Sequence, residues 1–245
     1  MDIFFELHTD LPREGPGDNE STIKAFSYLK ELPSDPFIVD IGCGPGMQTI
    51  QLAKLTDEKI ISLDTHQPYL DILQEQAKQH KVDEKIKILN HSMFDLPFEE
   101  NSIDVIWSES SIYIYGFKEA LRDWKKLLKE GGFFVVSEVS WVKKNPPIEC
   151  LDFWNREYPP MVSIEENLRI IKNMNYTLIS FFEIPKSSWM EHYYTPLKRK
   201  IKTLKEKYKR NKRILITLEK EMEEIRIFEK YNSYFGQVFY IMQKK

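Results

Sequence analysis

Hydrophobic positions along this 245-residue chain alternate between two kinds of spacing. Continuous apolar or β-branched runs predict buried strands, and apolar positions three and four residues apart predict amphipathic helices. The strand-like runs are residues 37–41, 59–64, 85–89, 103–108, 133–139, 177–184 and 237–242. The helix-like segments include residues 18–29, 47–55, 68–80, 118–128 and 163–174. Strands that alternate with helices in this way predict an α/β fold with a doubly wound parallel sheet.

Two segments depart from this alternation. Residues 1–17 are rich in proline and glycine, and residues 188–230 form a long charged helical region before the last strand. The helical pattern weakens at residues 210–212, which predicts either two helices or one bent helix. We expect a single domain over residues 1–245, in which residues 1–17 are a lid segment and residues 188–230 are a helical insertion on the substrate side.

The composition is that of an ordinary globular protein, with 42% hydrophobic residues and a formal net charge of −3. This charge gives no general attraction to nucleic acid or to an anionic membrane. No apolar run reaches the length of about 18 residues that suggests a membrane span. Asp2 and Glu6 stand where a signal peptide would carry basic residues, so we expect a cytoplasmic protein. Cys43 and Cys150 have no metal-ligand spacing, and no metal is expected.

The stretch FIVDIGCGPG places three of the 9 glycines at alternate positions, Gly42, Gly44 and Gly46, directly after the first predicted strand. Glycine permits a tight turn and a close approach of the backbone to a ligand. Met47 stands where a nicotinamide-binding fingerprint needs its third glycine, and the Lys-Ser/Thr of a phosphate-binding loop is also missing. Asp64 ends the next strand, where a carboxylate can accept both hydroxyls of a ribose. These features favour a nucleoside ligand over a tight turn followed by an incidental acid.

Residues 40–46, DIGCGPG, resemble motif I of the class I S-adenosylmethionine-dependent methyltransferases. Residues 90–138, which contain LPF, IDVIWSE and LKEGG, resemble the menaquinone/ubiquinone-type branch and bacterial small-molecule methyltransferases of that type. The resemblance implies a Rossmann-like methyltransferase fold of seven strands, the last antiparallel and inserted beside the fifth. It also implies S-adenosyl-L-methionine as the cofactor and methyl transfer to a small-molecule acceptor.

The same resemblance implies roles for individual positions. Asp40 and the three glycines would line the methionine part of the cofactor, and Asp64 would hold the ribose with Thr65 beside the adenosine. Family members often have an aspartate at the position of Ser92. Here the hydroxyl of Ser92 or the backbone of the next residue would serve the adenine instead. The remaining implied contacts are Met93 at the adenine and Ser108 and Glu109 at the methionine end and the substrate.

A general base is needed only if the acceptor is protonated when it binds. Glu109 is the first candidate, although it could instead contact the cofactor's ammonium group or cap the following turn. His66 more readily borders the adenine, and His192 more readily packs in an aromatic loop. An acceptor pocket that suits a flat or apolar molecule would be enclosed by Tyr113, Tyr115, Trp141, Trp189, Tyr193 and Tyr194. The residues do not distinguish a carbon, nitrogen or oxygen nucleophile.

Residues 197–213 carry ten basic residues and one acid, and an acid-rich stretch follows at residues 219–224. One hypothesis is an RNA methyltransferase that holds RNA on this basic helix. The other is a solvated helix whose partner is the acidic helix after it. Tyr208 is the run's one aromatic residue, so single-strand recognition by base stacking is disfavoured. A third hypothesis is a protein that binds S-adenosylmethionine without turnover. The sequence leaves monomer and homodimer both open.

Overall fold

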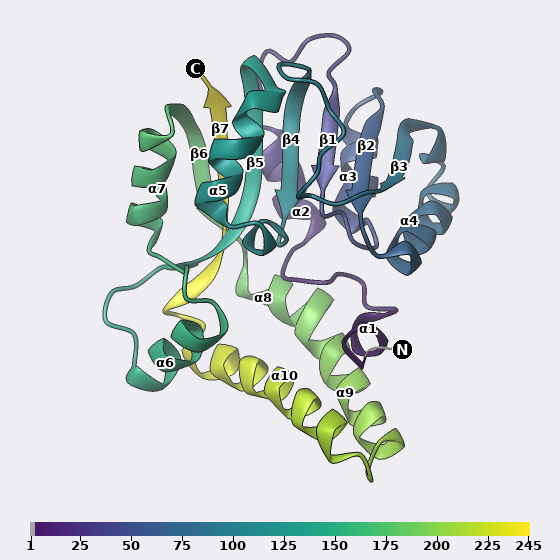
Figure 1. Ribbon diagram of the computed structural model, residues 1–245, viewed down its shortest axis with the longest axis vertical. Coiled ribbons are helices and arrows are strands. Elements are labelled where there is room, and N and C mark those ends of the chain that lie inside the picture. Colours follow the sequence, from purple (N-terminus) through teal and green to yellow (C-terminus); the bar gives the residue numbers. More distant parts are fainter. Residues whose placement is uncertain (1–2) are drawn as a thin grey trace.

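The computed structural model describes residues 3–245, so the first two residues of the predicted lid segment lie outside the described residues. Its centre is a seven-stranded sheet in the order β3-β2-β1-β4-β5-β7-β6 (Figure 1). The strands are β1 (Ile38–Ile41), β2 (Ile60–Asp64), β3 (Ile86–Asn90), β4 (Ile103–Glu109), β5 (Leu128–Trp141), β6 (Tyr176–Glu183) and β7 (Phe235–Lys244). Strand β7 runs antiparallel between β5 and β6, and β1 to β5 are parallel. The predicted α/β sheet is confirmed.

Helices cover both faces of the sheet because neighbouring strand residues point to opposite sides. Ile38 belongs to the core cluster under α2 (Asn19–Phe26), α3 (Met47–Leu55) and α4 (Gln67–Gln79). Val39 belongs to the cluster under α5 (Phe117–Asp123) and α7 (Ile164–Asn173). The strands in the middle of the sheet are buried on both faces, which explains their continuous apolar runs.

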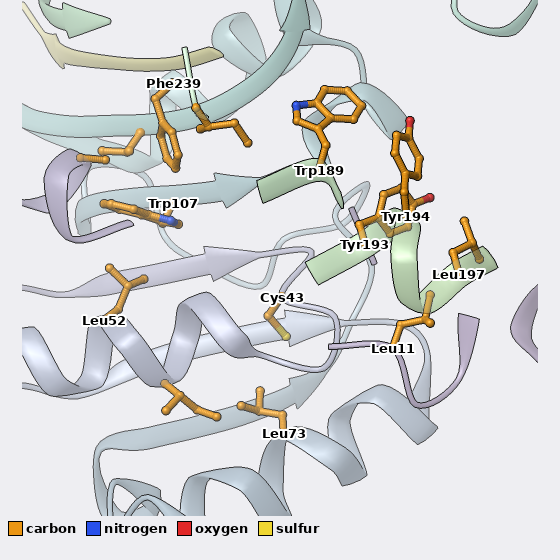
Figure 2. Close-up of a cluster of buried hydrophobic side chains, with 14 of the residues drawn as sticks. Leu11, Cys43, Leu52, Leu73, Trp107, Trp189, Tyr193, Tyr194, Leu197 and Phe239 are labelled. Carbon is orange, nitrogen blue, oxygen red and sulfur yellow. The ribbon is translucent and has the colours of Figure 1, made fainter. Parts of the chain in front are cut away.

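A third group of helices lies beyond the carboxyl ends of the parallel strands (Figure 1). It consists of α1 (Ile3–His8), α6 (Ile148–Glu157), α8 (Lys186–Trp189), the π-helical turn Met190–Tyr194, α9 (Thr195–Lys207) and α10 (Lys212–Tyr231). Of the two alternatives for residues 188–230, the structure has separate helices, and the Asn211 side chain caps α10 by accepting from the amide of Ile214. Trp189, Tyr193, Tyr194 and Leu197 continue the hydrophobic cluster that contains Trp107 and Phe239 (Figure 2).

Three details differ from the pattern-based expectation. The helix expected at residues 118–128 is α5 followed by a 3-10 turn, Trp124–Leu127, and β5 already begins at Leu128. Helices α1 and α6 were not expected, because both have a short apolar stripe beside prolines, which follow α1 at Pro12 and Pro16 and precede α6 at Pro146 and Pro147. None of the helices in the described part of the chain has the length and apolar character needed to cross a bilayer.

Candidate functional site

The turn from β1 into α3 exposes bare backbone at the carboxyl end of the sheet. Gly42 and Gly46 both have positive φ angles, of 72° and 86°. A Cβ on Gly42 would lie 2.5 Å from the Ser111 Oγ, and one on Gly46 would lie 2.2 Å from the Leu73 Cδ1. Any larger residue would therefore combine backbone strain with a collision. The sequence uses glycine here because the loop is packed on one side and open on the other.

Asp64 at the end of β2 is tied to this loop. Its Oδ2 accepts from the Gly44 amide at 3.0 Å, and its Oδ1 accepts from the His66 amide at 2.9 Å. A carboxylate has about four lone-pair sites, so each oxygen keeps an acceptor position for a further donor. The two backbone contacts hold the carboxylate in one orientation beside the glycines. The structure thus brings Asp64 together with the glycine loop, as the sequence reasoning expected of a ribose-binding acid.

A hollow of about 400 Å³ opens beside the loop and the acid. Small-molecule sites typically measure about 300–1,000 Å³. Its wall has three sources. The βα turns supply Gly42, Cys43, Gly44, Pro45, Asp64, Thr65 and His66; the end of β4 supplies Glu109, Ser110, Ser111, Tyr113 and Ile114; and the outer helices and N-terminal segment supply Phe4, Phe5, His8, Arg13, Glu14, Tyr193, Glu221 and Glu224.

The N-terminal segment closes over the hollow through specific contacts. The Phe5 ring stacks on His66 with centroids 3.8 Å apart and an interplanar angle of 6°. Glu14 accepts from the Tyr69 hydroxyl at 2.8 Å and lies 2.9 Å from the Nδ1 of His8. His66 is therefore engaged with the lid, and these contacts place the segment directly over the βα turns.

Glu109 is buried and accepts three hydrogen bonds. Its Oε2 accepts from Arg13 at 2.8 Å, and its Oε1 accepts from the Thr22 hydroxyl at 2.8 Å and the Trp107 indole at 2.9 Å. Arg13 is 5% exposed and Glu109 is 6% exposed, so the pair lies out of water. These contacts fix the orientation of the carboxylate, which anchors the N-terminal segment to β4. Sequence reasoning missed Arg13, although it is the single Lys or Arg within residues 1–17.

Gly46, which packs against Leu73, does not line the hollow, and four further predicted cofactor residues do not line it either. Buried Asp40 accepts from the Thr49 hydroxyl at 2.5 Å and from Gln48 at 3.3 Å, which joins β1 to the first turn of α3. Burial raises the pKa of Asp40 to about 7. The remaining three are Met93, whose Cε packs near Gly42, Ser92, which accepts from the Phe94 amide, and Ser108, whose hydroxyl contacts that of Ser111.

The predicted aromatic enclosure needs correction. Tyr115 packs between Phe94 and Trp124 on the other side of a 3-10 turn, and Trp141 packs against Phe235, its partner in the last β5–β7 pair of the sheet. Tyr115 follows Tyr113 by two residues, and in a 3-10 turn such residues point in different directions. Tyr194 is fully buried and donates to Glu224 at 2.8 Å. Of the six predicted aromatic residues, Tyr113, Trp189 and Tyr193 line this hollow or the one that adjoins it, whereas Tyr115, Trp141, Tyr194 and His192 line neither of these two.

A second hollow, of about 230 Å³, adjoins the first. The two share Glu14, Gly15, Ser110, Tyr113, Tyr193 and Glu224. The second hollow alone reaches Pro16, Glu138, Val139, Trp154, Glu157, Tyr158, Trp189 and Gln237. Burial raises the pKa of Glu138 to about 8, although the Tyr158 hydroxyl donates to it at 2.6 Å. Burial also raises the pKa of Glu224 to about 7.

Comparison with known proteins indicates the type of domain. Residues 38–132 match the family model described as methyltransferase domain. The chain is 24% identical to the sarcosine/dimethylglycine N-methyltransferase of Halorhodospira halochloris, over 56% of this chain and 50% of that one. It is 23% identical to the sterol 24-C-methyltransferase erg-4 of Neurospora crassa, over 79% and 58%. The chain thus spans about half the length of these curated relatives.

Solved structures agree on the fold. One is an S-adenosylmethionine-dependent methyltransferase from Thiobacillus denitrificans in complex with S-adenosyl-L-homocysteine. Its TM-score is 0.84 at 14% identity, and the match covers 100% of this chain and 99% of that one. The [4+2]-cyclase SpnF has a TM-score of 0.76 at 16% identity, with 98% of this chain and 93% of that one covered. Residues 38–132 thus match a methyltransferase domain, and the whole chain has the fold of the S-adenosylmethionine-dependent methyltransferases. The finer resemblance to the menaquinone/ubiquinone-type branch stays a prediction.

Proposed function

We propose that this protein binds S-adenosyl-L-methionine in the hollow beside the glycine loop and transfers its methyl group to a small molecule in the adjoining hollow. The cofactor supplies a sulfonium methyl group, which a nucleophile takes by in-line displacement while the electron pair of the broken bond stays on sulfur. The observation that carries the proposal is the pair of joined hollows, one bounded by Gly44 and Asp64 and the other bounded mainly by aromatic and acidic side chains.

The residues fit the cofactor in three respects. Asp64 keeps acceptor positions for the ribose hydroxyls, Thr65 and His66 border the same space, and Gly42 leaves the backbone uncovered. Asp40, Met93 and Ser108 would act by holding this loop, Ser92 by holding the turn at Phe94, and Glu109 by holding Arg13. These assignments are positioning roles, and they replace direct cofactor contact for the first four and proton transfer for Glu109.

The protein's contribution to the reaction is alignment and exclusion of water. Well-oriented reactants can gain roughly 7–11 kcal/mol relative to free collision in solution. The shared wall of the two hollows, which includes Tyr113 and Tyr193, would set the direction of approach. The N-terminal segment, held by the Phe5–His66 stack and the Arg13–Glu109 pair, would act as the lid.

Two measurements test this function. Titration calorimetry of the purified chain with S-adenosyl-L-homocysteine should give a one-to-one binding isotherm. Incubation with methyl-labelled S-adenosylmethionine and a small-molecule extract should then move label into a low-mass product. Absence of cofactor binding would contradict the whole proposal, whereas binding without any labelled product would point to a non-catalytic protein or to a different reaction, as the cyclase SpnF illustrates for this fold.

A further inference from the structure

The second hollow is lined by an unusual set of side chains for an apolar acceptor. Four glutamates border it, Glu14, Glu138, Glu157 and Glu224. Within the described chain, its lining contains no lysine, arginine or histidine. Five aromatic residues accompany the acids: Tyr113, Trp154, Tyr158, Trp189 and Tyr193.

The partners of these acids leave negative charge uncompensated in the hollow. Glu138 and Glu224 have tyrosine hydroxyls as partners, from Tyr158 and Tyr194. Glu14 contacts His8 and Tyr69. Among residues 3–245, Glu157 is the one of the four acids that forms an ion pair with an arginine, its exposed neighbour Arg156. Carboxylates close together in a partly dry cavity favour a cation, since a positive charge between them lowers the energy of every ionised form.

Two buried donors give an independent indication of a ligand. Trp154 is 7% exposed and Trp189 is 2% exposed, and both border the hollow. The indole Nε1 of each is buried without an acceptor among the described residues. Buried polar groups usually have a hydrogen-bond partner, so a ligand oxygen is the natural acceptor for a donor in such a wall. The rings themselves can face a cation, which aromatic rings attract.

Two of the four glutamates lie away from the proposed cofactor site. Glu138 and Glu157 border only the second hollow, together with Trp154 and Tyr158, and none of these four lines the space beside the glycine loop. The volume of about 230 Å³ also lies below the usual range of about 300–1,000 Å³ for drug-sized ligands. The acceptor therefore has few heavy atoms.

We infer that the acceptor is a small amine, positively charged in solution, that also carries an oxygen acceptor. This inference rests on the proposed function and names its substrate class. Glu138 accepts a proton from the ammonium nitrogen, which frees the nitrogen lone pair. That pair forms the new bond to the methyl carbon, and the electrons of the sulfur–methyl bond stay on sulfur. The products are the methylated amine, the thioether and a proton that Glu138 returns to solvent.

The buried position of Glu138 suits this task. Its pKa of about 8 gives an ionised fraction near neutral pH that a bound cation increases, because an adjacent positive charge favours the carboxylate. The charged groups that face the hollow or its acids are His8, Arg156, Glu14, Glu157, Glu221 and Glu224. Among them the acids predominate, so the second hollow favours the cation that Glu138 deprotonates.

The test compares a cation with its neutral isostere on protein saturated with S-adenosyl-L-homocysteine. Choline and 3,3-dimethylbutan-1-ol have the same shape and the same hydroxyl, and differ in one positive charge. Choline has no nucleophilic lone pair on nitrogen, so calorimetry reports recognition without turnover. We expect choline to bind at least about tenfold more tightly, a difference of about 1.4 kcal/mol. A smaller preference, or no choline binding at about 10 mM, overturns the inference.

Matched variants locate the effect. The double variant Glu138→Gln/Glu157→Gln keeps the shapes and the hydrogen bond from Tyr158, and should reduce the preference for choline at least about fivefold. The control Glu84→Gln removes an exposed acid before the edge strand β3 and should leave the preference unchanged. A double variant that retains the preference overturns the inference. Binding of S-adenosyl-L-homocysteine is measured on every protein. Failure of the native chain to bind it would contradict the proposed function, independently of the preference for choline.

Discussion

The two hollows are built in different ways, although they share a wall. The first is bounded by turns that follow consecutive strands, β1 and β2, and its key contacts involve backbone amides such as those of Gly44 and His66. The second is bounded by side chains from β5, α6, α8 and α10, which are far apart in the chain. The shape of the first hollow therefore depends on local turn geometry, and the shape of the second depends on tertiary packing. A family can keep one cofactor site while its acceptor sites diverge.

The largest expected effect is at the Arg13–Glu109 pair, which joins the N-terminal segment to the sheet. Replacing Arg13 by methionine leaves a buried carboxylate without its cation, which typically costs about 3–5 kcal/mol. We expect Arg13→Met to lower the free energy of unfolding in urea by that amount.

The double variant Arg13→Met/Glu109→Gln is the matched control. A glutamine oxygen can still accept from Thr22 and Trp107, and the uncompensated charge is gone. Most of the lost stability should return. If the single and double variants were equally unstable, the instability would not come from the uncompensated charge of Glu109.

The second prediction concerns the backbone-built hollow. Asp64→Ala removes the acceptor expected for two ribose hydroxyls and leaves the Gly44 amide unpaired. Hydrogen bonds to a charged group contribute about 1.5–3 kcal/mol each, so affinity for S-adenosyl-L-homocysteine should fall on the order of 100-fold. Calorimetry measures this against Asp71→Ala, a control on the exposed face of α4. A loss of affinity of less than about tenfold would mean that Asp64 does not bind the ribose of the cofactor.

The difference between the hollows also explains what the sequence could predict. The glycine loop and Asp64 were predictable because their positions follow from strand ends and from the φ angles that the turn requires. The positions of Tyr115 and Trp141 were not, since which way an aromatic side chain points depends on a 3-10 turn and on where β5 ends. Helix α6 and its Trp154 lacked a periodic pattern long enough to stand out.

Arg13 and Glu138 show a second limit. Each is an ordinary charged residue in the sequence, and its role depends on being buried opposite a partner that is distant along the chain. Arg13 meets Glu109, and Glu138 meets Tyr158. Burial of a charge costs energy that local patterns do not encode. Such residues become visible only when the tertiary contacts are known.

The third prediction concerns the pH dependence of stability that Glu138, a residue of the second hollow, produces. Glu138 has an ordinary pKa of 4.5 and a folded value of about 8, so between these values the folded protein binds more protons than the unfolded chain. Its contribution to stability is complete below about pH 4.5 and is lost as the pH rises through about 8. The free energy of unfolding should fall by up to about 1.4 kcal/mol per pH unit for each such group.

Asp40 and Glu224 titrate in the same direction but only up to about 7. The slope above pH 7 therefore reports mainly on Glu138. Urea unfolding between about pH 5 and 9 should show this upper slope in the native chain and not in Glu138→Gln. An identical slope in both proteins would mean that Glu138 is ionised in the folded state, in contact with water.

The smallest expected effect lies on the outer face of the helical layer. Most of the basic side chains of α9 that face other elements have acidic or carbonyl partners: Lys198 with Glu229, Lys200 with the Thr9 carbonyl, Lys205 with Glu219 and Lys207 with Glu6. Arg199 and Lys202 are exposed. Reversing both, as Arg199→Glu/Lys202→Glu, should change methyl transfer to a small acceptor by less than about twofold, because exposed charges contribute little at physiological salt.

The same variant decides the remaining alternative, an RNA acceptor held by residues 197–213. Affinity for RNA would fall steeply with salt, with a logarithmic slope of about −0.7 for each neutralised phosphate of a single strand. If both side chains bind phosphates, filter binding of tRNA should show the slope of the double variant reduced by about 1.4. An unchanged slope and unchanged activity would assign these charges to the solvated outside of a helical layer whose inner face, with Glu221 and Glu224, lines the hollows.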